Sequence, residues 1–393
     1  MQKNKIIQIS TFRPEKCGIA SWTEDVINYS HKQDSSLRNR VFAVNGYRQA
    51  HEYADFVDFC IEKDNLDDYF RAAEEINLDS NVGVVSVQHE FGIFGGHMGD
   101  HLIPFLESIK KPKLLTLHTV PREEDSDYTD PVRTRSAERR KVLKKILPLV
   151  DKTIAISDTA RNILLEEYGY DSDKTEVILH GTHEFSESIE DSKKILGLED
   201  RFVISTVGLV RSKRGLEYAI RALPPVVEKF PNVIYVLAGE THPREIVDGR
   251  DVYREQLMAE AENLGVRDNV HFVNNYLPLN SLLRHIQASD VGITPYTFPG
   301  QISSGVLSYY VGLDKPVVAT PFLYAQELLG EGRGVVLPDY NNPESMSSAL
   351  IDLVGNPGKL EEIRTNIGSI KGKLLWPNVA QAYIDAEKSL ISQ

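Results

Sequence analysis

The sequence has few cysteines and no long apolar run, and both deficits narrow what the protein can be. Its 393 residues include only two cysteines, Cys17 and Cys60. Two cysteines are too few for a disulfide framework, and this scarcity favours a reducing compartment. No stretch reaches the length of a membrane-spanning helix, and the first residues lack the apolar core of a signal peptide. We therefore expect a cytoplasmic protein.

Net positive charge is missing as well. The 57 acidic residues outnumber the 44 Lys and Arg, so the formal net charge is −13 at pH 7. This balance argues against nucleic acid as the main partner, because phosphate backbones reward a basic surface. The spaced glycines of a dinucleotide-binding fingerprint are also absent, so binding of NAD or FAD is not supported.

What the sequence does contain is an alternation of short apolar runs and amphipathic stretches along its whole length, which is typical of an α/β fold with parallel sheets. The series restarts at RFVISTVG, and the length suits two domains. Strands are predicted at Lys5–Ser10, Arg40–Val44, Val82–Gln88, Lys113–Leu117, Lys152–Ile156, Thr175–His180, Arg201–Gly208, Val233–Leu237, Val270–Val273, Val291–Pro295, Pro316–Ala319 and Gly334–Leu337, and helices at Ala20–Tyr29, Leu66–Ile76, Glu138–Leu147 and Gly215–Lys229.

The restart indicates two doubly wound, Rossmann-like domains that face one another across a cleft. We place the N-terminal domain at residues 1–180 and the C-terminal domain at 181–376, with a final helix at 377–393. Ligands of such sheets bind beyond the carboxyl ends of the strands. Residues directly after predicted strands are therefore the candidates for a functional site.

Three residues of the first half stand at such positions. Gly18 precedes a helix whose free N–H groups could hold an anion or a sugar, although a tight turn explains it equally well. Glu90 follows an apolar strand and precedes a glycine-rich loop. His118 ends another strand, where a structural hydrogen bond and a ligand contact are equally good explanations.

Three further patterns of the first half have ordinary explanations that we favour. His97 and His101 have the spacing of two metal ligands, but no third ligand accompanies them, and no metal is expected. Asp125 and Asp127 form a D-x-D pair that we assign to a solvated loop. The basic stretch 133–145 is assigned to the solvated face of a helix, with peripheral contact to an anionic membrane as the alternative.

In the second half, two strand-to-helix junctions favour an anion. After the strand that ends at Gly208, the loop VRSKRG places Arg211, Lys213 and Arg214 beside a helix start, which suits a diphosphate. After a later strand, the serines and glycine of QISSGV begin an apolar helix, where they could cap the helix or hold phosphate oxygens. These residues are Ser303, Ser304 and Gly305.

The order of these motifs resembles the retaining GT-B glycosyltransferases of the group-one family, and specifically their mannosyltransferase-like branch. TFRPEKCGIASWTED, VQHEFGIFGG and TLHTV resemble its N-terminal domain, and VGLVRSKRGLEYAI, LAGETHP and GQISSGVLSYYVG its C-terminal domain. The resemblance covers nearly the whole chain. It implies transfer of a hexose, with mannose favoured, from a nucleoside diphosphate sugar such as GDP-mannose to a glycan or lipid-linked acceptor. It also implies retention of configuration, no catalytic metal and no other cofactor.

The resemblance also implies roles for individual residues. Gly18 would approach the donor phosphate or the acceptor, and His118 would contact the donor sugar. As a mechanistic hypothesis, we expect Glu90 to help His118 orient that sugar. Arg211 and Arg214 would stabilise the leaving diphosphate by their charge. The donor-binding set implied in the C-terminal domain is Gly208, Lys213, Gly239, Leu277, Gln301, Ser303, Ser304, Gly305 and Glu327. The final helix at 377–393 would pack back on the N-terminal domain.

One departure from the family pattern concerns the donor. The family has two glutamates along the loop and helix near Gly300, but here no Glu occurs between Ala288 and Gln326, and Ser308 stands at the second position. Gln301 or Glu327 would have to replace the ribose contact. A sugar phosphorylase or nucleotide-sugar epimerase on the same fold, and a non-catalytic sugar-nucleotide-binding protein, are the alternatives to a transferase.

Overall fold

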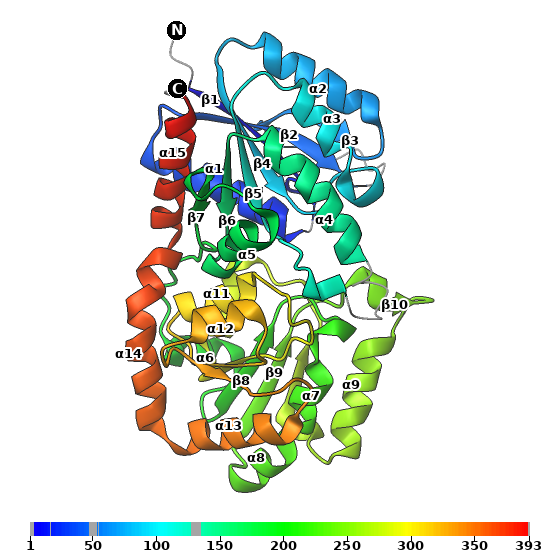
Figure 1. The fold of residues 1–393 in the computed structure, drawn as a ribbon. Coiled ribbons are helices and arrows are strands. Elements are labelled where there is room, and N and C mark those ends of the chain that lie inside the picture. Colours follow the sequence, from blue (N-terminus) through cyan, green and yellow to red (C-terminus); the bar gives the residue numbers. More distant parts are fainter. Residues whose placement is uncertain (1–3, 16, 47–52, 54, 127–134, 392–393) are drawn as a thin grey trace. The chain divides into compact units, whose positions relative to one another are not determined.

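The computed structural model divides the chain into two compact units. Unit 1 comprises Met1–Gly181 together with Trp376–Gln393, and unit 2 is the continuous segment Thr182–Leu375 (Figure 1). The structure describes all residues except 1–3, 16, 47–52, 54, 127–134 and 392–393.

Unit 1 is built on a parallel sheet of seven strands in the order β3-β2-β1-β4-β5-β6-β7. The chain winds outward from β1 in one direction and from β4 in the other, as in doubly wound nucleotide-binding folds. β4 lies in the middle and is buried at all of its positions. The strands are β1 (Lys5–Ser10), β2 (Arg38–Asn45), β3 (Val57–Glu62), β4 (Val82–His89), β5 (Lys113–Leu117), β6 (Lys152–Ala155) and β7 (Thr175–Val177).

Helices cover both faces of this sheet. On one face α1 and α15 lie side by side, and Trp22 and Val26 of α1 share a core with Val379 and Tyr383 of α15 (Figure 1). On the other face α3 packs against both α2 and α4. The helices of unit 1 are α1 (Gly18–Gln33), α2 (Leu66–Leu78), α3 (Leu102–Ser108), α4 (Arg135–Ile146), α5 (Asp158–Tyr168) and α15 (Trp376–Ile391).

Unit 2 repeats the same plan with six parallel strands in the order β12-β9-β8-β13-β14-β15. Counted along this unit the order is 3-2-1-4-5-6, which is that of the dinucleotide-binding fold. A two-stranded antiparallel hairpin, β10 (Ile246–Val247) and β11 (Arg250–Asp251), is inserted after β9. The sheet strands are β8 (Phe202–Val207), β9 (Val233–Ala238), β12 (Val270–Val273), β13 (Val291–Thr294), β14 (Val317–Ala319) and β15 (Val335–Val336).

The helices of unit 2 correct one prediction. The stretch Gly215–Lys229 is not one helix, because α7 ends at Arg221 and α8 begins at Leu223. Pro224 and Pro225 lack the N–H that would continue α7, but they suit the first turn of α8.

The helices of unit 2 are α6 (Ile189–Leu196), α7 (Leu216–Arg221), α8 (Leu223–Lys229), α9 (Val252–Asn263), α10 (Leu279–Gln287), α11 (Gly305–Gly312), α12 (Leu323–Leu329), α13 (Pro343–Gly355) and α14 (Pro357–Leu374).

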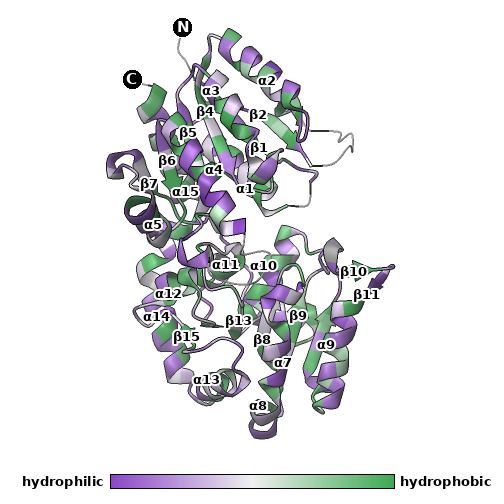
Figure 2. Ribbon diagram, turned by 45° about the vertical axis from the view of Figure 1, so that its right-hand side comes forward, coloured by the Kyte–Doolittle hydropathy of each residue, from purple (hydrophilic) through white to green (hydrophobic). Residues whose placement is uncertain are grey.

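The hydropathy of the chain explains these layers. Figure 2 shows hydrophobic and hydrophilic residues on different sides of single helices, as expected for helices that cover a sheet with one face. Side chains of Asn65, Ser157, Ser188 and Asn342 accept hydrogen bonds from backbone N–H groups at the starts of α2, α5, α6 and α13. Together these features confirm the predicted α/β class with two Rossmann-like sheets. No helix among the described residues is both long and apolar enough to cross a membrane.

A polar layer lies inside unit 1 between the sheet and α15. Gln8 of β1 donates to the Glu387 carboxyl of α15 (3.1 Å), and the hydroxyls of Thr116 and Tyr383 lie 3.1 Å apart. Gln8, Thr116, Tyr383 and Glu387 are all fully buried. Burial raises the pKa of Glu387 to about 8, because a charged carboxylate is poorly solvated there. The side chain is therefore largely protonated at neutral pH.

We predict that Glu387 makes unit 1 less stable at alkaline pH. Its pKa is raised in the folded state, so its contribution is fully present below pH 4.5 and is lost as the pH rises toward 8. The slope is at most about 1.4 kcal/mol per pH unit for one proton. Glu387→Gln keeps the shape of the side chain and removes the titration. Melting temperatures from pH 5 to 9 should fall less steeply for this variant than for the parent, and parallel curves would contradict the assignment.

Candidate functional site

The topology of each sheet gathers the sequence-based candidates at one edge. Connections run in opposite directions from β1 and β4 in unit 1 and from β8 and β13 in unit 2, and such a switch point leaves a crevice at the carboxyl ends of the two strands. Gly18 follows β1 and Glu90 follows β4, while His118 follows the next strand, β5. In unit 2 the loop Gly208–Arg214 follows β8, and Gln301, Ser303, Ser304 and Gly305 follow β13.

The loops after β8 and β9 come into direct backbone contact. Gly208 has φ +98° and Gly239 has φ +149°, and a Cβ placed on Gly239 would lie 2.0 Å from the carbonyl oxygen of Gly208. Only glycine permits that approach. A Cβ on Gly208 would lie 3.4 Å from Nη1 of Arg214. The structure thus brings Gly208, Gly239 and Arg214, three of the predicted site residues, together.

Arg214 is held over an aromatic ring but lacks a complete set of hydrogen-bond partners. It lies in a short 3₁₀ turn, Ser212–Arg214, and its guanidinium carbon is 5.2 Å from the centroid of the Tyr296 ring, within the range of a cation–π interaction. Its Nη1 atom is buried and has no hydrogen-bond partner among the described residues. Leaving a buried charged donor unsatisfied costs more than about 1–3 kcal/mol. Nη1 of Arg214 is therefore a candidate donor to a bound ligand.

The start of α11 adjoins this arginine through Tyr296. The Tyr296 hydroxyl lies 3.3 Å from Oγ of Ser304, and that oxygen accepts a hydrogen bond from the N–H of Leu307 (3.2 Å). Ser304 is therefore an N-cap, as one of the two explanations of the serines expects. Gly305 is the first residue of α11, and the Gln301 side chain donates to the carbonyl of Ser303 (2.8 Å).

The other candidates of unit 2 lie further from this group or point elsewhere. Arg211 and Lys213 are exposed. Leu277 follows β12 and Glu327 lies on α12 after β14, and both strands are two places from β8 in the sheet. Ser308 is fully buried, and its hydroxyl lies 2.8 Å from that of Tyr324. Its side chain is therefore occupied inside the core.

In unit 1, His118 is a buried and neutral group. Its Nε2 lies 3.0 Å from Oε1 of Gln88 on the neighbouring strand, and its ring meets that of Trp22 edge to face at 5.3 Å. Burial, with smaller contributions from His180 and His89, lowers the pKa of His118 to about 3. The imidazole is therefore uncharged at neutral pH and can act there as a hydrogen-bonding group.

Glu90 is linked to the neighbour of this histidine, and Gly18 begins a helix that contacts it. The hydroxyl of Thr119, next to His118, donates to Glu90 Oε2 at 2.5 Å, and the N–H of His118 donates to the carbonyl of His89. Gly18 begins α1, the helix that carries Trp22, and no side chain caps that helix start. A Cβ on Gly18 would meet nothing within 4 Å, so packing gives no reason for a glycine there.

The structure corrects two assignments in unit 1. Asp125 is not solvated: it is 2% exposed, and its carboxylate accepts from the guanidinium (3.1 Å) and backbone N–H of Arg122. Asp127 lies outside the described residues. Within the basic stretch 133–145, Arg140 is buried and pairs with Glu167, whereas Lys141, Lys144 and Lys145 are exposed.

The described part of the chain holds no group of three or more His, Cys, Asp or Glu that could bind a metal.

Two residues of the site are missing from the sequence-based candidates. Tyr296 connects Arg214 to Ser304, and Gln88 holds His118. Each carries a signal that is visible in the sequence. Gln88 is a polar residue inside an apolar strand, and Tyr296 is an aromatic residue directly after one.

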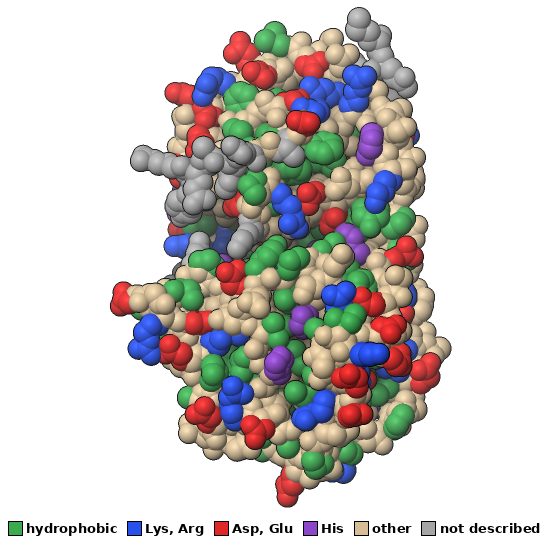
Figure 3. All heavy atoms as spheres, turned by 180° about the vertical axis from the view of Figure 1, so that it is seen from behind, with side chains coloured by type: hydrophobic (Ala, Val, Ile, Leu, Met, Phe, Trp, Pro, Cys, Tyr) green, Lys and Arg blue, Asp and Glu red, His purple; other side chains and the backbone are tan. Residues whose placement is uncertain are grey.

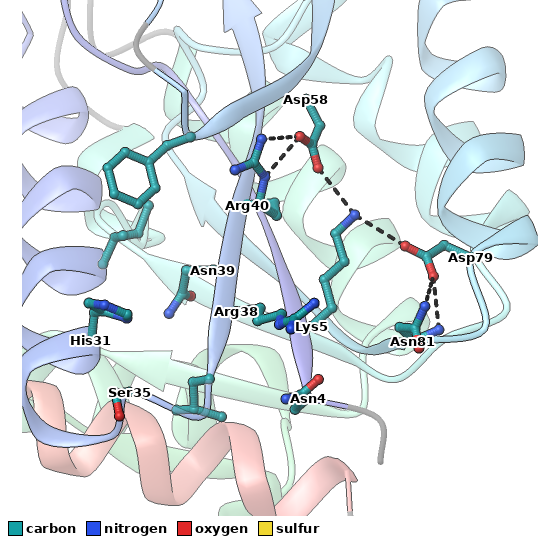
Figure 4. Close-up of a pocket in the computed structure, with 13 residues that line it drawn as sticks. Asn4, Lys5, His31, Ser35, Arg38, Asn39, Arg40, Asp58, Asp79 and Asn81 are labelled. Atoms are coloured by element: carbon teal, nitrogen blue, oxygen red, sulfur yellow. Dashed lines mark hydrogen bonds and ion pairs between the residues drawn. The ribbon is translucent and has the colours of Figure 1, made fainter. Parts of the chain in front are cut away.

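The cavity of about 630 Å³ drawn in Figure 4 lies away from all of these residues. It is lined by the amino-terminal ends of β1 and β2 and the last turns of α1. Lys5 pairs with Asp58 and Asp79 there, at 3.1 Å each, and Arg40 pairs with Asp58. Because ligands of doubly wound sheets bind at the opposite edge, we do not place the candidate site in this cavity.

The surface charge agrees with the composition. On the face shown in Figure 3, Lys and Arg side chains are interspersed with Asp and Glu rather than gathered into a basic patch. A nucleic-acid-binding face would concentrate positive charge.

Comparison with known proteins gives matches over both units. Residues 188–369 match the family "Glycosyl transferases group 1", and residues 81–183 match "Glycosyltransferase Family 4". A relative is the D-inositol 3-phosphate glycosyltransferase of Corynebacterium urealyticum, 23% identical over 280 residues. The match covers 68% of this chain, which spans 62% of the length of that curated relative.

Solved structures share the fold over the full length. HepE of Anabaena, solved in complex with UDP, has a TM-score of 0.74 at 16% identity, with 98% of this chain and 100% of that chain covered. Sucrose-phosphate synthase of Thermosynechococcus elongatus has a TM-score of 0.79 at 14% identity, with 99% of each chain covered. Both structures have the GT-B architecture, which agrees with the two sheets found here.

We predict that two Gly→Ala substitutions at the site differ sharply in their effect on stability. Gly239→Ala places a Cβ 2.0 Å from the Gly208 oxygen and should lower the free energy of unfolding by about 1–3 kcal/mol. Gly18→Ala meets no neighbour and should change it by less than about 1 kcal/mol. Denaturant unfolding of the two variants tests this pair. Equal stability of the two would show that the backbone contact at Gly239 is not tight.

Proposed function

We propose that the chain transfers a hexose from a nucleoside diphosphate sugar to a glycan or lipid-linked acceptor, since residues 188–369 match the group-1 glycosyltransferases. The diphosphate binds in unit 2, at the loop Gly208–Arg214 and the start of α11. Gly18, Glu90 and His118 are the candidates of unit 1 for contacts to the sugar and the acceptor. The family match supports the reaction class, and the residues named here support the location.

One observation carries the location of the diphosphate. Nη1 of Arg214 is buried without a hydrogen-bond partner among the described residues, beside a glycine at the switch point of a doubly wound sheet. A phosphate oxygen would satisfy that donor through a charge-assisted hydrogen bond. Gly208, with its positive φ and no side chain, leaves room for the same group.

The proposed reaction needs stabilised negative charge and a directed proton. The bond between the sugar C1 and the diphosphate oxygen breaks, and the acceptor hydroxyl oxygen forms the new bond to C1 on the same face, so that configuration is retained. The hydroxyl proton passes to the leaving phosphate oxygen. The charge that develops on the diphosphate is stabilised by Arg214, with Arg211 and Lys213 on the same loop.

The histidine of unit 1 has a different task. With a pKa of about 3, His118 is neutral throughout the physiological range. It therefore orients the transferred hexose by a hydrogen bond, with Glu90 beside it, and does not exchange a proton with it. No metal ion takes part in this proposal.

GDP-mannose is our proposed donor, on the strength of the resemblance to the mannosyltransferase-like branch. The fold relative HepE was solved with UDP, so UDP-sugars are the competing donors. The Ser308 hydroxyl is already hydrogen-bonded to that of Tyr324, which leaves Gln301 or Glu327 to contact the ribose.

Thermal-shift measurements with GDP-, UDP- and ADP-sugars should show stabilisation by one group of donors. Stabilisation by none of them would contradict the proposal, and donor binding without transfer would favour a non-catalytic binding protein.

We predict that Arg214→Ala impairs donor binding without unfolding the protein. The substitution removes the charged donor of the proposed diphosphate site, so the dissociation constant for the nucleoside diphosphate should rise by about tenfold or more. Transfer should fall at least as strongly. Calorimetric titration with GDP and UDP measures the binding.

Arg221→Ala is the matched control for this prediction. Arg221 is an arginine of the same unit that pairs with Glu260 at the surface (2.6 Å). Its removal should leave nucleotide affinity unchanged. Wild-type affinity in Arg214→Ala would remove this residue from the donor site.

A further inference from the structure

The basic loop of unit 2 is tied along its length to the segment that follows β9. The N–H of Val210 donates to the carbonyl of Glu240 (3.0 Å), and the N–H of His242 donates to the carbonyl of Val210 (2.9 Å). These bonds extend the pairing of β8 and β9 beyond the sheet, with Val210 and Thr241 as bridge partners. The conformation of the loop therefore depends on where the neighbouring segment lies.

A second tie holds the turn that carries Arg214. Both the N–H and the hydroxyl of Ser212 donate to Oε1 of Glu245, at 3.2 and 3.0 Å. Ser212 begins the 3₁₀ turn that ends at Arg214. Glu245 belongs to the turn directly before the β10–β11 hairpin.

The segment after β9 is itself anchored by a buried arginine. Arg254 of α9 is 4% exposed, and its Nη2 donates to the carbonyl of Gly239 (2.7 Å) and to Oγ1 of Thr241 (3.1 Å). Its Nε donates to the Asp251 carboxylate (3.1 Å), to which the Thr241 hydroxyl also donates. Asp251 further accepts from the backbone N–H of Arg254 and so caps α9. The guanidinium fork thus fixes two points of the segment at once.

A buried cation of this kind is costly for stability alone. Burial lowers the pKa of Arg254 from its ordinary value, and Nη1 has no hydrogen-bond partner among the residues that the structure describes. Well-packed apolar residues in place of a buried ion pair are often no less stable. Arg254 instead fixes the position of Gly239, which lies against Gly208. Gly208 in turn lies beside the Arg214 side chain.

We propose that the segment Gly239–Arg254 is a brace that preorganises the diphosphate-binding loop, with Arg254 as its buried positioning residue and Glu245 as its second tie. This inference rests on the proposed function, since it deepens the role of the same loop. Arg254 acts through the position of Arg214 and not by touching the donor. The brace spares the ligand the cost of ordering the loop.

The first test measures the affinity of the full-length protein for GDP and UDP by calorimetric titration. Arg254→Lys keeps the charge but loses the fork that reaches Gly239 and Thr241 together, and it should weaken binding by about tenfold or more, since small misplacements at a site are amplified. Glu245→Ala removes the tie to Ser212 outside the core and should weaken binding severalfold with an unchanged melting temperature. If Arg254→Lys does not fold, Glu245→Ala decides the question.

The matched control is Glu255→Ala. Glu255 of α9 pairs with Arg250 of β11 at the surface, where their side chains are 47% and 71% exposed. Its loss should leave nucleotide affinity unchanged. Wild-type affinity in Arg254→Lys and Glu245→Ala would overturn the brace. Absence of GDP, UDP and ADP binding in the unaltered protein would instead refute the proposed function.

A double-mutant cycle separates positioning from general destabilisation. If Arg254 acts through Arg214, then Arg254→Lys should weaken binding by less than about twofold once Arg214 is already Ala, because residues that act as a unit are not additive. A merely structural role predicts the same fold-loss in both backgrounds. Equal losses in the two backgrounds would contradict the proposal.

Discussion

The close approach of two backbone segments at Gly208 and Gly239 is the constraint on which the candidate donor site depends. A side chain at position 239 would clash with the Gly208 carbonyl. The loops after β8 and β9 can therefore lie this close together only because residue 239 is a glycine. Gly208 in turn lies beside the Arg214 side chain, whose guanidinium lies over the Tyr296 ring next to the start of α11. The position of Arg214 therefore depends on this backbone contact together with the side-chain ties of Arg254 and Glu245.

Three buried ionisable side chains of unit 1 are largely uncharged at pH 7. Burial lowers the pKa values of His89 and His118 to about 3 and raises that of Glu387 to about 8. Other buried groups of the same unit are paired instead, as Asp125 is with Arg122 and Arg140 with Glu167. Burial therefore neutralises a side chain in this unit where no oppositely charged partner lies beside it.

The sequence predicts the fold better than it predicts the contacts of the site. Mostly apolar runs such as VGVVSV mark the buried central strands, and residues after them fall at the switch points as expected. Strand β3, VDFCIE, has a single buried position and begins and ends near acidic residues, so its pattern is too weak to predict it. The break between α7 and α8 at Ala222 is predicted only if Pro224 and Pro225 are given more weight than the helical pattern around them.

The ties of the site depend on pairings that no local pattern contains. Gln88 meets His118 across neighbouring strands, and Arg254 reaches back 15 residues to Gly239. Asp125 looks solvated because its neighbours in the sequence are polar, yet Arg122 draws it into the protein. Such contacts follow from the tertiary fold and not from composition or spacing.

The packing of α15 in unit 1 has a consequence for the order in which the protein assembles. The hydrophobic core around Trp22 and Ile6 is completed by Trp376, Tyr383 and Leu390, which the ribosome delivers only after all of unit 2 has been made. Unit 2, as one uninterrupted segment, has its whole sheet available earlier. During synthesis the first sheet to emerge is therefore the last to be covered, and the face that awaits α15 stays open until then.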